Sequence, residues 1–164
     1  MRLTLYTDYA LRTLIYLGLR SDRRVSIREV AAAHRISENH LVKVVHQLGR
    51  GGFVETTRGK GGGLRLARAP ETIRIGDVVR FTEEDMALVA CFEGAEGSGC
   101  ALVNACRLQS LLGEALGAFL AVLDRHTLAD LLARPNREVM AERLGLGLAG
   151  AEPQELATGG AATA

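Results

Sequence analysis

The chain has 164 residues, 48% of them hydrophobic, enough for one domain of ordinary size with a real core and an appendage. No run of eighteen apolar residues occurs, so no membrane span is expected, and the start lacks the pattern of a signal peptide, which predicts a cytoplasmic protein. The net charge of +1 is uneven: residues 1–80 carry fifteen Lys and Arg against seven Asp and Glu, whereas residues 81–164 carry five against twelve. The basic half is therefore expected to attract a polyanion, unless the asymmetry is an accident of surface composition.

Apolar spacing predicts three helices in the first fifty residues. The first covers residues 8–19. The second begins in "SIREVAAAH", where Ser26 and Glu29 have the spacing of a capping box. The third follows Ser37 as N-cap and ends at a pair of glycines. Its apolar stripe has helical spacing and consists of Leu41, Val44, Val45 and Leu48.

The period then changes to that of a hairpin. "FVETT" and "LRLAR" are short strand-like runs around the basic, glycine-rich "RGKGGG". Two short helices, 27–34 and 38–50, followed at once by such a hairpin have the order of a winged helix-turn-helix. We therefore predict a mainly α fold with a small β-hairpin wing, whose DNA-binding domain spans residues 1–80. A further short helix is expected from about Gly76.

The predicted DNA interface combines the start of the third helix with the wing. In a helix-turn-helix, the N-terminal residues of the second helix of the pair contact base edges in the major groove. Ser37 and Asn39 can hydrogen-bond bases, and Lys43 can reach a guanine or a phosphate; the alternative for Ser37 is a helix cap only. A nucleotide-binding loop is not supported, because Leu64 stands where the last glycine of G-x-G-x-x-G would be. The candidate DNA-binding residues are Arg28, Ser37, Asn39, His40, Lys43, Arg58, Lys60 and Arg65.

All three cysteines of the chain, Cys91, Cys100 and Cys106, lie in one glycine-rich segment with the spacing C-x8-C-x5-C. The lack of a C-x-x-C pair excludes a thioredoxin-like site and argues against a zinc ribbon. Three thiolates on a loop can hold three corners of an iron–sulfur cluster, with a fourth ligand from elsewhere. The alternative is three unligated thiols. A thiol redox enzyme is less favoured, because the nearby Glu93 and Glu96 would raise the pKa of a thiol.

Residues 107–124 form the longest predicted helix, about 27 Å at a rise of roughly 1.5 Å per residue. Its broad apolar face indicates a dimerisation helix, and the alternative is packing on its own domain. "TLADLL" adds a turn or two, with Thr127 as N-cap. The sequence thus predicts a linker helix and cluster-binding loop over 81–106, a dimerisation helix with C-terminal turns over 107–144, and a disordered tail over 145–164.

Taken together, "MRLTLYTDYALRTLIYL", "ISENHLVKVVHQLGRGGFVETTRGKGGGLRLAR" and the cysteine triplet before a long helix resemble the dimeric winged-helix iron–sulfur repressors, which include the NsrR and IscR types. The resemblance covers roughly residues 1–135. It is closest to the NsrR type, whose "TDY" motif is here Thr7-Asp8-Tyr9, and it implies that Asp8 of the partner subunit is the fourth cluster ligand. IscR-type proteins have a histidine three residues after the last cysteine, where this chain has Gln109.

The resemblance implies a homodimeric repressor rather than an enzyme. It would hold a [4Fe-4S] cluster, with [2Fe-2S] as the alternative, sense nitric oxide, and release a palindromic double-stranded DNA operator when the cluster is nitrosylated. The first cysteine interval, eight residues, is longer than in many relatives, which leaves iron or cluster status as an alternative signal. A helix cap is the alternative role for Asp8.

Overall fold

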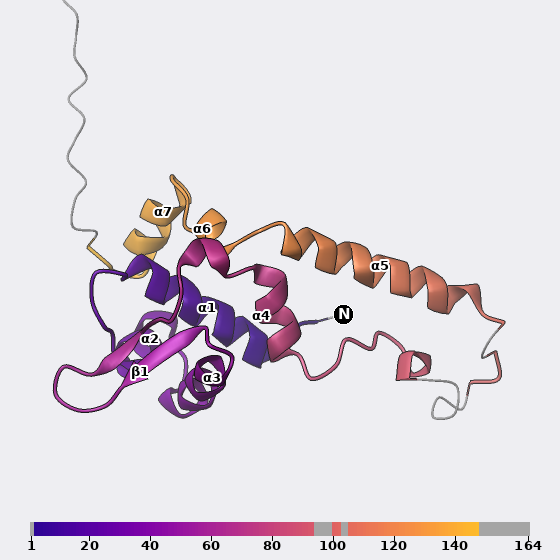
Figure 1. The fold of residues 1–164 in the computed structure, drawn as a ribbon, viewed down its shortest axis with the longest axis horizontal. Coiled ribbons are helices and arrows are strands. Elements are labelled where there is room, and N and C mark those ends of the chain that lie inside the picture. Colours follow the sequence, from indigo (N-terminus) through magenta and orange to yellow (C-terminus); the bar gives the residue numbers. More distant parts are fainter. Residues whose placement is uncertain (1, 94–99, 103–104, 148–164) are drawn as a thin grey trace, which may run out of the picture.

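A helical body and one long helix that extends away from it make up the architecture (Figure 1). The computed structural model describes residues 2–93, 100–102 and 105–147. Helices dominate, and one antiparallel hairpin projects from the body on the side away from the long helix. The predicted mainly α fold with a β-hairpin wing is confirmed. No helix of the described ranges is long and apolar enough to cross a membrane.

Helix α1, Leu5–Leu19, runs through the centre of the body and begins three residues before the predicted start. Thr4 is its N-cap, and the Thr4 hydroxyl accepts a hydrogen bond of 3.2 Å from the amide of Thr7. Asp8 therefore lies inside the helix, and the alternative in which Asp8 caps α1 is wrong. The helix buries a continuous apolar face against the other elements of the body, because its core residues are 0–2% exposed at Ala10, Leu14 and Leu17.

The helix-turn-helix pair consists of α2, Ile27–His34, and α3, Glu38–Arg50. The predicted capping box is confirmed: the Glu29 amide donates to the Ser26 hydroxyl at 3.2 Å, and the Ser26 amide donates to the Glu29 carboxylate at 2.7 Å. The chain turns between the helices at Arg35, whose φ of 54° is left-handed. The predicted apolar stripe of α3 is fully buried, and α3 ends at Arg50 with Gly51 as its C-cap, the first of the two glycines predicted to stop it.

The wing is formed by β1, Val54–Thr57, and β2, Gly63–Leu66, with Val54 opposite Leu66. Its tip requires glycine, because a Cβ at Gly62 would lie 2.2 Å from the carbonyl oxygen of Thr57. The stem of the hairpin is fastened to the segment before α2. Val25 and Leu64 exchange two main-chain hydrogen bonds, of 3.0 and 2.7 Å.

Two segments far apart in the sequence meet on the body after the wing. The short 3-10 turn η1, Pro70–Thr72, leads into α4, Ile75–Thr82, the helix predicted from about Gly76. Far along the sequence, α6, Leu128–Leu131, packs beside η1 with Thr127 as its predicted N-cap. The amide of Leu128 donates to the carbonyl of Ile73 at 2.8 Å, and Leu128 is completely buried. Residues after the long helix therefore complete the core of the body.

Helix α5, Arg107–Asp124, has the predicted bounds and projects from the body (Figure 1). No residue of α5, all of which the structure describes, is buried within the single chain. Its last turn is attached to α4, where Arg80 forms an ion pair with Asp124. The first half of α5 thus carries its apolar residues outside the core.

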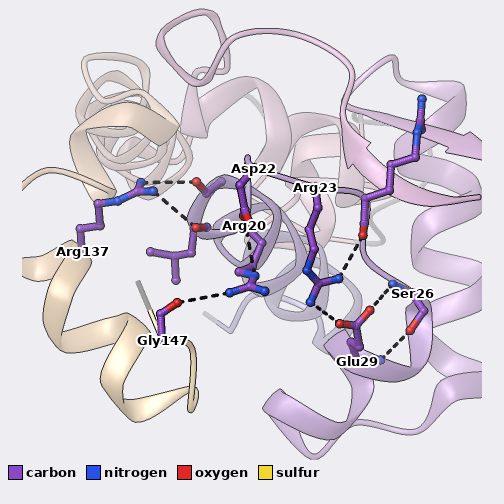
Figure 2. A network of polar contacts seen from close by, with 10 residues as sticks. Arg20, Asp22, Arg23, Ser26, Glu29, Arg137 and Gly147 are labelled. Atoms are coloured by element: carbon purple, nitrogen blue, oxygen red, sulfur yellow. Dashed lines mark hydrogen bonds and ion pairs between the residues drawn. The ribbon is translucent and has the colours of Figure 1, made fainter. Parts of the chain in front are cut away.

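Helix α7, Asn136–Arg143, was not predicted, because its composition is mostly polar and lacks a strong apolar stripe. It lies against the end of α1: the Arg137 guanidinium donates to the carbonyls of Gly18 and Leu19, both at 3.4 Å (Figure 2). Beyond it, Leu146 packs against the core. The rest of the predicted tail, residues 148–164, lies outside the described residues.

Candidate nucleic-acid interface and cysteine segment

The two faces of α3 have opposite characters. Leu41 and Val44 point into the core, and the residues between and before them are exposed. The exposed set at the start of the helix consists of Ser37, Glu38, Asn39, His40, Val42 and Lys43. Ser37 occupies the N-cap position, but its hydroxyl makes no capping hydrogen bond to α3. The polar groups predicted for base recognition therefore lie together on one accessible surface.

Two of the candidate DNA-binding residues, His40 on this surface and Arg28 on α2, have neighbours that the sequence did not reveal. The imidazole of His40 stacks on the ring of Tyr9, with centroids 6.3 Å apart and planes at 25°. The first turn of the third helix therefore touches the helix that carries Asp8. Arg28 is 86% exposed and lies 4.0 Å from the carboxylate of Glu38, a contact too long and too solvated to hold it firmly.

The three candidate cations of the wing differ in whether they form an ion pair. Arg58 and Lys60 are exposed at the tip and belong to no ion pair among the described residues. Arg65, on the stem, donates to the carboxylate of Glu55 at 2.9 and 2.7 Å. Glu55 also accepts a hydrogen bond of 2.7 Å from Arg24, and this bond, together with those from Arg65, lowers the pKa of Glu55.

Glu55 was missed by the sequence analysis, although a signal for it exists. Glu55 and Arg65 are direct partners in the register of the hairpin, and opposite charges at facing positions of an antiparallel pair attract one another. The register follows from where the tip begins and ends. Arg24 could not be found in this way, because its side chain comes from another part of the chain.

The cysteine segment bridges the body and the start of α5. Cys91 lies in the 3-10 turn η2, Ala90–Glu93, and is half-buried, as is Cys106, the N-cap residue of α5. Cys100 is exposed. Cys91 and Cys106 are not in a disulfide. The thiolate is the form of a cysteine side chain that binds a metal.

A hydrogen bond from Gln109 holds Cys91 close to the start of α5, the helix whose N-cap residue is Cys106. It lies three residues after Cys106, in the first turn of α5, and its side-chain amide donates a hydrogen bond of 2.9 Å to the carbonyl of Cys91. The start of the segment is thereby held beside the helix on which the segment ends. Among the residues that the structure describes, no group of three His, Cys, Asp or Glu side chains is close enough to hold a metal within one chain.

Asp8 faces solvent from the first turns of α1 and pairs with Arg12. The Arg12 guanidinium contacts the two carboxylate oxygens of Asp8, both at 3.0 Å, and the Asp8 side chain is 40% exposed. Arg12 was not singled out from the sequence, although Asp8 and Arg12 both lie in the helix predicted over residues 8–19 and their i,i+4 spacing is the signal that could have found the pair. The structure does not bring Asp8 into a cluster with the cysteines of its own chain among the described residues.

The start of α1 is joined to the end of α4 by a small polar network. The amide of Thr4 donates to the carboxylate of Glu83 at 2.9 Å, and the buried hydroxyls of Thr7 and Thr82 are 2.9 Å apart. Beside this network lies an open cavity of about 1060 Å³, between the start of α1, the segment 83–89 and α5, which contributes Leu112 and Leu116. An apolar face of α5 is therefore left without a covering element in the single chain.

The fold and its exposed surfaces define a winged helix-turn-helix protein with an appended helix, and comparisons with known proteins identify its family. The family model described as Rrf2, Iron-dependent Transcriptional regulator, matches residues 3–134. The chain therefore belongs to the Rrf2 family and is a transcriptional regulator rather than an enzyme. Curated relatives include the HTH-type transcriptional regulator NsrR of Geobacillus kaustophilus, 52% identical over 148 residues, which are 88% of this chain and 100% of the relative.

Further relatives agree with this assignment. The HTH-type transcriptional regulator NsrR of Bacillus subtilis is 50% identical over 133 residues, 80% of this chain and 90% of its own length. Among solved structures, a transcriptional regulator from Listeria innocua has a TM-score of 0.68 at 31% identity, covering 82% of this chain and 88% of its own. IscR of T. potens has a TM-score of 0.65 at 25% identity, covering 80% and 86%.

Proposed function

We propose that the protein is a homodimeric, DNA-binding repressor that holds an iron–sulfur cluster, senses nitric oxide, and releases its operator when the cluster is nitrosylated. The observation that carries the proposal is the hydrogen bond from Gln109 to Cys91, because it gathers both ends of the cysteine segment at the start of α5. Relatives about half identical to the chain bear the name NsrR, which supports the same function.

The cluster ligands would be Cys91, Cys100, Cys106 and Asp8 of the partner subunit. The donor set suits a cluster, because thiolates are the usual ligands of cluster iron, and the hydrogen bond from Gln109 holds Cys91 beside the start of α5, where Cys106 lies. A carboxylate is a harder and weaker ligand than a thiolate. The cluster, which we take to be [4Fe-4S], would therefore supply one iron at which a small molecule such as nitric oxide can react.

Double-stranded DNA would be bound by the exposed start of α3 and by the wing. Ser37 and Asn39 would contact base edges, and Lys43, Arg58 and Lys60 would contact base edges or phosphates. His40 lies in the first turn of the recognition helix and Arg28 lies on α2 beside it, whereas Arg65, on the stem of the wing, would stay paired with Glu55 next to the bound DNA. In a dimer the two recognition helices would meet the two halves of a palindromic site.

The homodimer would form through α5. No residue of α5 is buried within its own chain, although the helix is rich in apolar residues. Large exposed apolar surfaces of this kind mark interfaces. Leu108 and Leu111 are 55% and 61% exposed, and the cavity beside α5 would receive apolar side chains from a second copy. A partner subunit placed there would lie near the start of α1, where Asp8 is found.

Dimer contacts and DNA recognition would be coupled through α1. Asp8 is followed by Tyr9, whose ring stacks on His40 in the first turn of α3. If Asp8 were held by the partner subunit, its release would loosen the position of α1 relative to the recognition helix. Such a two-state element lets a local chemical change alter DNA affinity.

A second candidate function is a repressor of the same family that responds to iron or to cluster supply. The long interval between Cys91 and Cys100 and the iron-dependent description of the family favour it. The two functions share the cluster and the DNA interface. They differ only in the signal that removes the cluster.

The test uses the full-length protein purified without oxygen. Visible absorbance and native mass spectrometry should show a cluster, a dimer should form, and binding to a duplex selected from a random pool should be lost on adding nitric oxide. Replacing Cys91, Cys100 or Cys106 by Ala should remove iron and sulfide. Ser110→Ala, a substitution of similar size in the first turn of α5, should leave iron and sulfide in place. A colourless protein that binds DNA regardless of nitric oxide would contradict the proposal. A cluster-containing protein whose DNA binding survives nitric oxide but is lost with an iron chelator would favour the second candidate.

A further inference from the structure

Three segments of the DNA-binding half meet at the carboxylate of Glu55. Glu55 lies on β1, and it accepts hydrogen bonds from Arg65 on β2 and from Arg24 in the loop before α2. Each guanidinium uses a different carboxylate oxygen, Oε1 for Arg24 and Oε2 for Arg65. Hydrogen bonds of this kind, in which both partners are charged, are about twice as strong as neutral ones.

The ion pairs act beside a main-chain connection. Val25, adjacent to Arg24, is bonded to Leu64, adjacent to Arg65, so the wing stem is attached to the helix-turn-helix at two neighbouring points. A two-stranded hairpin is only marginally stable by itself in water. The side chains at Glu55 therefore restrict how the tip of the wing can swing relative to α3.

The same contacts pair two cations beside the wing stem with a carboxylate. Arg24 and Arg65 are 24% and 56% exposed, and each lies 2.7 Å from the Glu55 carboxylate. Arg58 and Lys60 at the tip have no such partner among the described residues. The wing thus presents charge at its tip and neutralises charge at its stem.

We propose that Glu55 is a positioning residue for sequence-specific DNA binding: it fixes the wing relative to the recognition helix and keeps Arg24 and Arg65 from binding phosphates indiscriminately. The inference rests on the DNA-binding part of the proposed function. It does not depend on the cluster or on nitric oxide. Glu55 itself carries a negative charge and is not expected to touch DNA.

The two roles of Glu55 predict changes in opposite directions for Glu55→Gln. Without the carboxylate, the wing is less well oriented, so affinity for the duplex selected by the wild-type protein should fall. The freed arginines should leave affinity for a shuffled duplex of the same composition unchanged or raise it. The ratio of the two affinities should fall roughly threefold to tenfold, the size expected for losing one or two partly exposed ion pairs.

Salt dependence provides an independent readout on the shuffled duplex. If an arginine released by Glu55→Gln makes a new phosphate contact, the slope of log affinity against log salt should become steeper by about 0.9. Arg24→Gln should lower affinity for the selected duplex without steepening the slope, because it loosens the wing while removing a cation. Melting curves of both variants establish that the body remains folded.

Glu71→Gln is the matched control, because it changes the charge by the same amount at an exposed acid outside the wing. An equal rise in both affinities with Glu55→Gln, or the same change of ratio with Glu71→Gln, would mean that only net charge matters and would overturn the inference. An equal fall in both would show a general loss of binding and would overturn it as well. If the wild-type protein binds neither duplex, the proposed DNA-binding function fails instead.

Discussion

Arg80 of α4 and Asp124 of α5 form a two-pronged ion pair, with nitrogen–oxygen distances of 2.7 and 2.6 Å. The contact raises the pKa of the Arg80 guanidinium and lowers the pKa of the Asp124 carboxyl. It lies over Gly76, where a Cβ would be 1.9 Å from an oxygen of Asp124. The ion pair and the glycine together determine how the last turn of α5 sits on α4.

The first prediction concerns this contact. Gly76→Ala should destabilise the protein by about 1–2 kcal/mol, because the added methyl must displace a carboxylate held by Arg80. In an Asp124→Ala background the same change should be neutral or stabilise by up to about 1 kcal/mol, since alanine is the better helix former. Urea unfolding of the four variants gives the coupling energy directly. Equal effects of Gly76→Ala in both backgrounds would show that Asp124 is not the obstacle.

The second prediction concerns the proposed dimer helix. Leu116→Glu or Phe119→Glu should give a folded monomer, because each places a charge on the apolar face of α5 that the single chain leaves uncovered. Analytical ultracentrifugation gives the mass, and far-UV circular dichroism shows whether the helices persist. Glu114→Lys, on the exposed side of the same helix, should remain dimeric. A dimer unchanged by both apolar-face substitutions would count against the interface.

The third prediction separates base contacts from phosphate contacts. Asn39→Ala should cost roughly 1–3 kcal/mol on the selected duplex and relax base preference at one position of each half-site. Lys60→Ala should weaken binding to all sequences and reduce the salt slope by about one. Fluorescence anisotropy with selected and shuffled duplexes distinguishes the two patterns. Equal losses on both duplexes for both variants would remove Asn39 from base recognition.

The fourth prediction concerns Asp8. Asp8→Ala should give a cluster that is lost several times faster in air and reacts with nitric oxide at a changed rate, and Asp8→Cys should give a more inert one, because thiolate is the better ligand. Arg12→Ala breaks the only ion pair that Asp8 makes among the described residues. That pair is worth roughly 0.3–0.5 kcal/mol. If Arg12→Ala and Asp8→Ala have the same effect on cluster lifetime, Asp8 acts through Arg12 and is not a ligand.

The fifth prediction concerns pH and the capping box of α2 (Figure 2). Hydrogen bonding from Arg23, assisted by Ser26, lowers the pKa of Glu29 from 4.5 to about 2. The depressed pKa means that Glu29 stabilises the fold above pH about 4.5 and loses this contribution as the pH falls to about 2. Glu29→Ala should cost roughly 1 kcal/mol at pH 7. The difference from the wild type, measured by urea unfolding of cluster-free protein, should vanish near pH 2; a constant difference would refute the linkage.

Local rules were sufficient for most of the fold. The capping box at Ser26, the buried stripe of α3 and the bounds of α5 follow from short-range spacing and helix signals, which the sequence displays directly. The start of α1 was misplaced, because Thr4 caps the helix before its apolar period becomes obvious. Helix α7 was missed, because it is held by contacts of Arg137 with the distant end of α1 rather than by a pattern of its own.

The candidate site was less accessible to sequence reasoning. Exposure of Asn39 and Lys43 could be predicted, because the buried positions of an amphipathic helix determine which face remains outside. The stacking of His40 on Tyr9 and the bond from Arg24 to Glu55 join residues 31 positions apart, and no local period encodes such pairs. The ligand role of Asp8 remains a prediction, because it depends on a second subunit.

The return of the chain to the body at Leu128 has a consequence for protein synthesis. Leu128 and Leu132 are core residues that pack with α1, yet the ribosome makes them after the cysteine segment and the whole of α5. The DNA-binding half therefore cannot close its core while the nascent chain ends before these leucines, even though its own helices have already been translated. A product truncated before the cysteine segment would also lack a finished core and would be open to proteolysis. The order of translation thus favours stable chains that already carry the cysteine segment.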